Sequence, residues 1–268
     1  MLMAALMMIF VFVGGRFFGP HGIVIALILS GGMNFFSFFY SDKLALSMMK
    51  ARPVDRNSHP QLYSMVEDLT QRANLPMPAV YICPQQSPNA FATGRDPHHA
   101  AVAVTEGILA TLTQDELRGV IAHELTHIKN RDTLISTIAA TVAGVITSLG
   151  YMLYFLPIGG DDDDNPLASI ALIILAPIAA AVIQMAISRR REFMADAGGA
   201  EIAGSPYGLA NALMKLENYG RKIPMKVAHS HDNMFIVQPF SGKDAMNLFS
   251  THPSTKARIK ALTGNDIN

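Results

Sequence analysis

The chain has 268 residues, of which 50% are hydrophobic and only 16% are charged, whereas soluble domains are about 25% charged. This apolar content excludes a disordered chain, and 21 basic against 21 acidic residues give a formal net charge of zero, so no nucleic-acid partner is expected. The single cysteine, Cys83, excludes an intrachain disulfide and a cysteine-based zinc finger.

Four apolar segments predict membrane-spanning helices. Residues 1–15 and 17–41 form a first pair, and residues 134–158 and 166–188, which contain no charged residue and no histidine, form a second pair. As helices the last two would be roughly 38 Å and 35 Å long, enough to cross a hydrocarbon layer of about 30 Å. The first segment reaches only about 22 Å, so a signal peptide is an alternative for it. Buried helices of a soluble protein are the alternative for the whole set.

The distribution of basic residues predicts the orientation of these helices. Lysines and arginines follow the second segment, precede the third and follow the fourth, whereas the loop at 159–165 carries four aspartates and no basic residue. Because basic residues concentrate on the cytoplasmic side of a membrane, both termini and both polar regions are expected in the cytoplasm. The predicted organisation is an N-terminal transmembrane hairpin (1–41), a first cytoplasmic region (42–133), a second transmembrane hairpin (134–188) and a second cytoplasmic region (189–268).

The first cytoplasmic region is expected to contain a helix and a small group of strands. Apolar residues at helical spacing predict a helix over 60–74. Residues 78–83 predict a strand, and residues 89–105 predict a β-hairpin. These elements make the fold mainly α with a small β-sheet, within a polytopic membrane protein.

Helices are expected to dominate the rest of the polar chain. Thr113 and Glu116 form a capping box that opens a helix, and this helix is expected to run straight on into the third apolar segment. The second cytoplasmic region is predicted to be helical to about residue 219. A final helix is expected near 254–263.

One sequence motif predicts a catalytic metal site. His123, Glu124 and His127 form the pattern His-Glu-x-x-His inside the helix that follows the capping box. Residues four apart lie on one helical face, so both imidazoles can bind one metal ion, with Glu124 about 100° round the helix. Zinc with an open position activates water, and a neighbouring carboxylate can take the proton and pass it to a leaving amine. A helix with two surface histidines is the alternative.

A third ligand is expected just after the fourth apolar segment. Glu192 and Asp196 are again four residues apart and share one predicted helical face. One carboxylate can bind the metal while the other accepts a hydrogen bond from a ligand imidazole, and a solvated acidic pair beside arginines is the alternative. If the helices run through the membrane boundary, His127 and Glu192 lie within roughly 6–11 Å of the hydrocarbon edge. The site would then join the cytoplasmic ends of two neighbouring membrane helices.

On these residues the chain resembles the HtpX-type membrane zinc metalloproteases, which are relatives of the CAAX prenyl endopeptidases. The resemblance covers nearly the whole chain and rests on both apolar hairpins and on the motifs SPNAFATGRDPHHAAVAVTEGIL (87–109), IAHELTHIKNRD (121–132), RREFMADAGGA (190–200) and THPSTKARIKAL (251–262). It implies a zincin-like cytoplasmic protease domain with one zinc ion (Zn2+) per chain. The implied ligands are His123, His127 and Glu192, with Glu124 as the catalytic base and Asp196 orienting a ligand histidine.

The resemblance also implies a location, substrates and partners. Such enzymes lie in the cytoplasmic (inner) membrane of bacteria or archaea, with the active site on the cytoplasmic side, and belong to the stress response. They serve protein quality control by cleaving damaged or misfolded membrane proteins at cytoplasmic segments, and members can cut themselves. The expected partners are therefore membrane-protein or unfolded polypeptide substrates and the lipid bilayer.

Further residues are candidates for substrate contact and catalysis. Asn89 is expected to contact the substrate backbone, and His252 is a candidate donor to the developing oxyanion or a fourth zinc ligand in a closed state. A plain histidine at the start of a helix is the alternative for His252, and Arg258 either pairs with an active-site carboxylate or lies on the surface. In zincin proteases an extended substrate pairs with an edge strand near the metal, and the candidate edge strand here is Ala101, Val102, Ala103 and Val104.

Two other functions stay open at this point. A prenyl-protein endopeptidase would need a large enclosed chamber, which usually takes more than four membrane helices. A non-enzymatic metal-binding membrane protein would have no use for Glu124 beside the histidine pair. Replacing Glu124 by glutamine separates these hypotheses, because only the protease hypothesis predicts retained zinc and lost cleavage.

Overall fold

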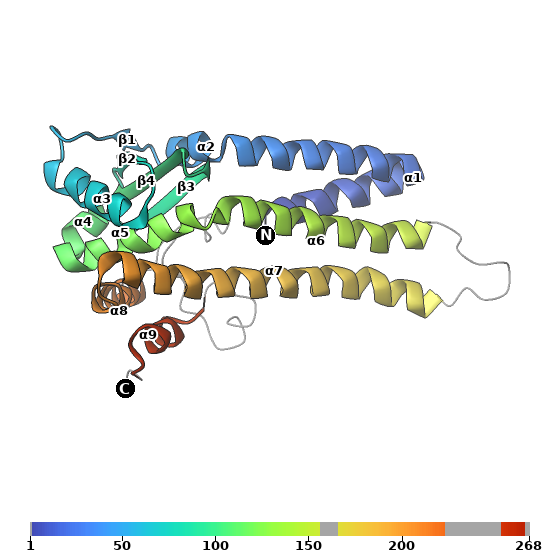
Figure 1. The fold of residues 1–268 in the computed structure, drawn as a ribbon. Coiled ribbons are helices and arrows are strands. Elements are labelled where there is room, and N and C mark those ends of the chain that lie inside the picture. Colours follow the sequence, from blue (N-terminus) through green and yellow to red (C-terminus); the bar gives the residue numbers. More distant parts are fainter. Residues whose placement is uncertain (1, 156–165, 223–252, 266–268) are drawn as a thin grey trace. The chain divides into compact units, whose positions relative to one another are not determined.

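The computed structural model describes residues 2–155, 166–222 and 253–265 and divides into two compact units. The first unit contains the apolar helical segments, and the second contains a small sheet with the helices that pack on it (Figure 1). The chain is therefore mainly helical with a small mixed sheet, as the sequence predicted. The bounds of the first unit are Met1–Phe38 and Ile135–Ile187, and those of the second are Phe39–Leu134 and Ser188–Asn268.

Helix α1 (Leu2–Phe39) of the first unit folds back on itself at Gly19 (Figure 1). Gly19 has φ 62° and ψ −151°, a conformation that glycine adopts without the clash a Cβ would cause. Val11 in one arm is buried in a cluster with Ile23 and Ala26 in the other. The two helices expected near the N-terminus are thus joined directly by a tight turn.

Helices α6 (Asp132–Phe155) and α7 (Pro166–Ala203) each have one end in the second unit and continue through the first. Among the residues searched, Ile9–Phe39 is the one helical stretch long and apolar enough to cross a membrane, and Asp132–Thr147 is a shorter apolar helix. Much of the third and fourth apolar segments lies outside the described side chains. Their membrane crossings therefore stay predictions.

The second unit contains a four-stranded sheet in the order β1-β2-β4-β3. Strands β3 and β4 form the predicted antiparallel hairpin, and β2 runs parallel to β4 on its other side. Strand β4 is therefore central: Ala101 pairs with Ala79 of β2 and with Thr93 of β3. The expectation that residues 101–104 form an edge strand is wrong, because both sides of their backbone are already hydrogen-bonded within the sheet. The strands are β1 (Arg52–Pro53), β2 (Ala79–Cys83), β3 (Ala90–Asp96) and β4 (His99–Thr105).

Alternate strand residues face two different layers, as the pleat requires. Val102 and Val104 belong to the main core, which also contains residues of α3, α5 and α8. Cys83, Phe91 and Ala103 belong to a second cluster that is packed against residues of α2. Cys83 is thus a core residue, and burial raises the pKa of its thiol to about 11. The helices named here are α2 (Ser41–Met48), α3 (Pro60–Ala73), α4 (Glu106–Thr111), α5 (Gln114–Lys129), α8 (Tyr207–Lys222) and α9 (Thr255–Thr263).

Helix α5, which carries the metal-binding motif, begins at the predicted capping box. The Thr113 hydroxyl accepts a hydrogen bond from the Glu116 backbone N–H, and the Glu116 carboxylate accepts one from the Thr113 N–H at 2.8 Å. The helix ends at Lys129 and does not continue into α6, because Arg131 adopts a left-handed conformation with φ 54°. The prediction of one continuous helix is wrong here, whereas α7 does run without a break from the fourth apolar segment into the second unit.

Candidate metal centre

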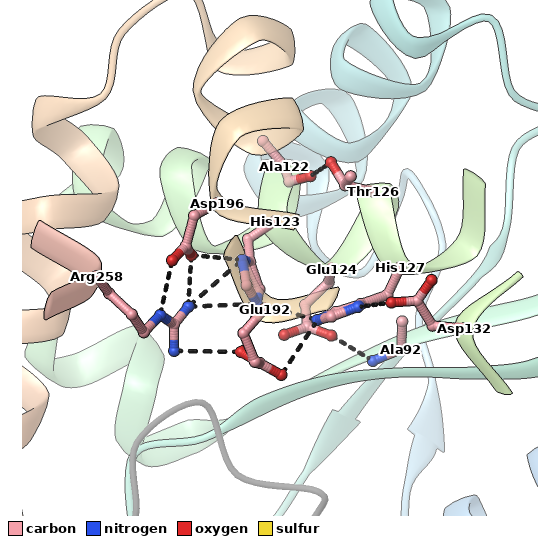
Figure 2. Close-up of polar contacts among 10 residues, drawn as sticks. All are labelled: Ala92, Ala122, His123, Glu124, Thr126, His127, Asp132, Glu192, Asp196 and Arg258. Atoms are coloured by element: carbon pink, nitrogen blue, oxygen red, sulfur yellow. Dashed lines mark hydrogen bonds and ion pairs between the residues drawn. The ribbon is translucent and has the colours of Figure 1, made fainter. Parts of the chain in front are cut away.

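Two histidines of α5 form one side of the centre. His123 and His127 lie on the same helical face, and their Nε2 atoms are 3.1 Å apart (Figure 2). His123 is only 1% exposed, and His127 is half-buried. The helix therefore directs the same nitrogen of both rings toward one point, as the spacing predicted.

Glu192 of α7 brings a carboxylate to these rings. Its Oε2 lies 3.7 Å from His123 Nε2, and its Oε1 lies 3.9 Å from His127 Nε2. One ligand atom from each of the three residues lies within 4.8 Å of the others. Helix α7 approaches α5 this closely at Gly199, where a Cβ would stand 2.9 Å from the backbone N and Cα of His123.

Asp196 and Arg258 fix the orientation of the His123 ring. His123 Nδ1 is 3.0 Å from Asp196 Oδ1, so a neutral imidazole donates there and keeps Nε2 unprotonated, as a metal requires. Arg258 of α9 donates two hydrogen bonds to Asp196, at 2.8 Å and 2.6 Å, and its Nη1 is 3.4 Å from Glu192 Oε2. Burial opposes ionisation of Asp196, but the Arg258 charge and the hydrogen bonds from Arg258 and His123 together outweigh burial and hold the pKa of this carboxyl below its usual value. Arg258 is 1% exposed, so it pairs with the site and does not lie on the surface.

Asp132 is a site residue that the sequence reasoning missed. It is the first residue of α6, and its Oδ2 is 2.6 Å from His127 Nδ1. Its Oδ1 forms an ion pair with Arg191 of α7. In a continuous helix Asp132 would lie about 140° round the axis from His127, so the contact depends on the break at Arg131. The only signal in the sequence was an aspartate placed shortly after the histidine motif.

Glu124 lies beside the histidine pair and is 5% exposed. Its Oε2 accepts a hydrogen bond from the Ala92 N–H of strand β3 at 2.7 Å. Burial raises the pKa of the Glu124 carboxyl above its usual value, although the two neighbouring histidines oppose this shift. Such a carboxyl is suited to accept and return a proton, because general bases work best with a pKa nearer to the working pH.

The donor set fits a divalent transition metal. Two imidazoles and one carboxylate are the protein ligands of one class of catalytic metal site, in which a further position is left for water or substrate. Both rings also have a carboxylate on Nδ1, and such partners fix the tautomer and the ring orientation. Within the described residues, this is the one group of three histidine, cysteine or acidic side chains spaced to hold an ion.

The other predicted site residues that the structure describes lie in the sheet or just before one of its strands. His252 lies outside the described residues. Asn89 is buried just before β3 and exchanges hydrogen bonds with Thr105 of β4, so its contact with substrate stays a prediction. Ala101, Val102, Ala103 and Val104 are buried in the middle of the sheet.

Comparison with known proteins identifies relatives of this chain. Residues 56–266 match the model of peptidase family M48. Proteins named Protease HtpX homolog from Burkholderia thailandensis and Burkholderia cenocepacia are each 53% identical to this chain over 269 residues, which cover 98% of this chain and 94% of theirs. The crystal structure of S. mikatae Ste24p has a similar fold, with a TM-score of 0.59 and 17% identity; the match covers 96% of this chain and 62% of that longer chain. The chain therefore belongs to peptidase family M48 and is an HtpX-like metalloprotease.

Proposed function

We propose that the chain is a zinc-dependent integral-membrane endopeptidase that cleaves damaged or misfolded membrane proteins at cytoplasmic segments. The observation that carries this proposal is the convergence of His123, His127 and Glu192, with the Glu124 carboxylate buried beside them. The 53% identity to proteins named Protease HtpX homolog, over nearly the full length of both chains, supports the same assignment.

Zinc is the proposed ion because two imidazoles and a carboxylate match its preferred ligands. When bound, it supplies a Lewis acid that lowers the pKa of water to about 7. The chain's own contribution is to present His123 Nε2 and His127 Nε2 as unprotonated donors, because Asp196 and Asp132 take the hydrogen bonds of the two Nδ1 atoms.

Glu124 is the proposed base. Its carboxylate accepts the proton of the attacking water and then returns it to the leaving amine of the cleaved peptide bond. The Ala92 N–H holds one oxygen of this carboxylate, which fixes its direction, and burial favours the protonated intermediate form of Glu124. The same side chain can therefore act first as a base and then as an acid.

We further propose four membrane spans in a bacterial or archaeal inner membrane, with both termini and the active site in the cytoplasm. Support comes from the apolar stretch Ile9–Phe39, from the uncharged segments at 134–158 and 166–188, and from the basic residues that flank them. Helix α7 leads without a break to Glu192, which is about 6 Å along the helix from the end of the fourth segment. Substrate segments close to the bilayer, including those of a second copy of this chain, are therefore expected to be cleaved.

The test compares the purified full-length chain with the Glu124→Gln variant. A misfolded membrane protein serves as the substrate, and bound metal is measured in both proteins. We expect one zinc per chain in both, and cleavage reduced by about 10²–10⁴-fold in the variant, because proton transfer is lost while the ligands are kept.

Glu201→Gln is the matched control, because Glu201 is an exposed residue of α7 and should keep full activity. Persistent cleavage by Glu124→Gln would contradict the proposed mechanism, and a wild-type chain without zinc would contradict the proposed metal. If the wild type cut only prenylated peptides and left misfolded membrane proteins intact, the prenyl-protein hypothesis would replace this one.

A further inference from the structure

Each of the two histidines contacts an aspartate that is itself paired with an arginine. In the proposed function Asp132 accepts the hydrogen bond of His127 Nδ1, but Arg191, which pairs with Asp132, has no role so far. Asp132 lies between His127 on one side and Arg191 on the other, and Figure 2 shows its carboxylate against the ring. We propose that Asp132 and Arg191 act together as positioning residues that hold the His127 imidazole in the orientation that the metal requires. This inference rests on the metal site of the proposed function.

The contact between Asp132 and His127 is short and sheltered. The distance from Oδ2 to Nδ1 is 2.6 Å, and the side chains of the two residues are 12% and 19% exposed. A hydrogen bond to a carboxylate at this distance is of the strong, charge-assisted kind. It fixes the tautomer, so Nε2 keeps its lone pair on the side of His123 and Glu192.

Arg191 completes the arrangement from the other side of the carboxylate. It pairs with Oδ1, while Oδ2 faces the ring, so the two contacts together restrict rotation of the carboxylate. The side chain of Arg191 is 12% exposed, and its positive charge offsets the cost of burying Asp132. Arg191 directly precedes Glu192 on α7, so one helical turn supplies both a metal ligand and the partner of Asp132.

A simpler role for Asp132 is to stabilise the start of α6, where an acidic residue in the first turn interacts favourably with the helix dipole. Asp115 occupies the same kind of position in the first turn of α5, is exposed and lies away from the metal centre. Asp115→Asn therefore removes a comparable first-turn carboxylate without touching His127. Comparing the two variants separates the two roles.

The experiment measures the zinc affinity of the full-length chain in detergent by competition with a chromophoric chelator. Asp132→Asn is expected to bind zinc about 10–100-fold more weakly than the wild type, and Asp115→Asn is expected to bind it as the wild type does. At saturating zinc, Asp132→Asn should show a lower kcat with an unchanged KM. Wild-type zinc affinity in Asp132→Asn would overturn the inference, whereas a wild type that binds no zinc would overturn the proposed function itself.

The role of Arg191 is tested in two backgrounds. Arg191→Met should weaken zinc binding roughly tenfold in the wild-type background and no further when Asp132 is already asparagine, because the arginine acts through that carboxylate. Arg191→Lys should restore most of the affinity, and Arg190→Met, at the exposed neighbouring position, should leave it unchanged. Equal losses from Arg191→Met in both backgrounds would show that Arg191 does not act through Asp132 and would overturn the pairing. If Asp132→Asn does not fold, Arg191→Met and Arg191→Lys in the wild-type background still test the inference, and an unchanged zinc affinity in Arg191→Met would overturn it.

Discussion

Arg258 connects the C-terminal helix α9 to both carboxylates of the metal centre. Its guanidinium is bidentate on Asp196 and also faces Glu192. Burial alone would lower the pKa of the guanidinium, but the charge and hydrogen bonds of Asp196 and the charges of Glu192 and Glu124 together outweigh burial and keep the pKa above its usual value. The arginine is therefore charged, and its docking places a positive charge between two buried acidic groups.

Replacing Arg258 by methionine removes this charge and leaves Asp196 and Glu192 buried without it. Breaking a buried ion pair from one side costs about 3–5 kcal/mol, so we expect a clear loss of stability in thermal unfolding of the detergent-solubilised chain. Lys256→Met, at an exposed position on the same helix, is the control and should be close to neutral. An Arg258→Met variant as stable as this control would show that the ion pairs contribute nothing measurable.

Residues of the centre differ in how far the sequence could predict them. The pairs His123–His127 and Glu192–Asp196 are each four residues apart on one helix, so helical periodicity alone predicts that each pair shares a face. Asp132 reaches His127 only because the chain breaks its helix at Arg131. That break has no periodic signal, and this is why the contact could not be predicted.

At the scale of elements, the N-terminal end of α5 is fixed by Glu116. Its carboxylate accepts hydrogen bonds from the Thr113 N–H and, at 2.6 Å, from Lys215 Nζ of α8. Burial would raise the pKa of Glu116, but these hydrogen bonds and the Lys215 charge together outweigh burial and hold the pKa below its usual value. The helix that carries both histidines is thereby tied to α8 by an ionised group.

This pKa shift predicts how stability depends on pH. Since the pKa of Glu116 is lower in the folded chain than in the unfolded chain, its contribution is fully present above the unfolded pKa and is lost as the pH falls through the folded one. Glu116→Gln should therefore lower the stability by about 1 kcal/mol at neutral pH and by less near pH 3.5. Unfolding of the wild type and the variant at both pH values tests this. Glu201→Gln should show no such difference, and a Glu116→Gln effect that does not change with pH would contradict the prediction.

The crossing of α5 and α7 depends on Gly199. A Cβ at this position would stand 2.9 Å from His123 backbone atoms, so Gly199→Ala must push the two helices apart and move Glu192 away from the imidazoles. Overpacking of this kind costs about 1–3 kcal/mol, and we expect a lower thermal midpoint together with weaker zinc binding. Gly31→Ala is the matched control, because that helical position has no atom within 4 Å of the added Cβ. An unchanged zinc affinity in Gly199→Ala would contradict this account of the crossing.

The order of the strands in the sheet could not be predicted from local sequence patterns. Two short strand-like segments on either side of a turn at 95–99 predicted the β3–β4 hairpin, which is a local pairing. The parallel pairing of β2 with β4 joins segments that are distant in the chain, and nothing in the sequence of either strand specifies it. This pairing makes β4 central and leaves β3 as the edge strand that supplies the Ala92 N–H to Glu124.

For the whole molecule, the division into two units follows the division of the sequence into apolar and polar parts. The unit boundaries near residues 38, 134 and 188 fall close to the ends of the predicted membrane hairpins, because the apolar segments pack mainly with one another. The metal centre belongs entirely to the second unit, while α6 and α7 leave that unit as the helices that begin at Asp132 and pass Glu192. The metal centre therefore lies on whichever side of the membrane the second unit occupies.

The topology is tested by cysteine labelling. Cys83 is fully buried, so the natural chain provides a low background for a membrane-impermeant thiol reagent. Ser58→Cys, at an exposed site of the polar unit, and Gly160→Cys, between the third and fourth apolar segments, should be labelled from opposite sides of intact membrane vesicles. Because basic residues lie beside the first site and aspartates beside the second, we expect the first site to be the cytoplasmic one. Labelling of both sites from the same side would contradict the proposed topology, because residues 134–188 would then not cross the bilayer twice with their loop outside. The active site would in that case have to reach its substrates by another arrangement of the chain.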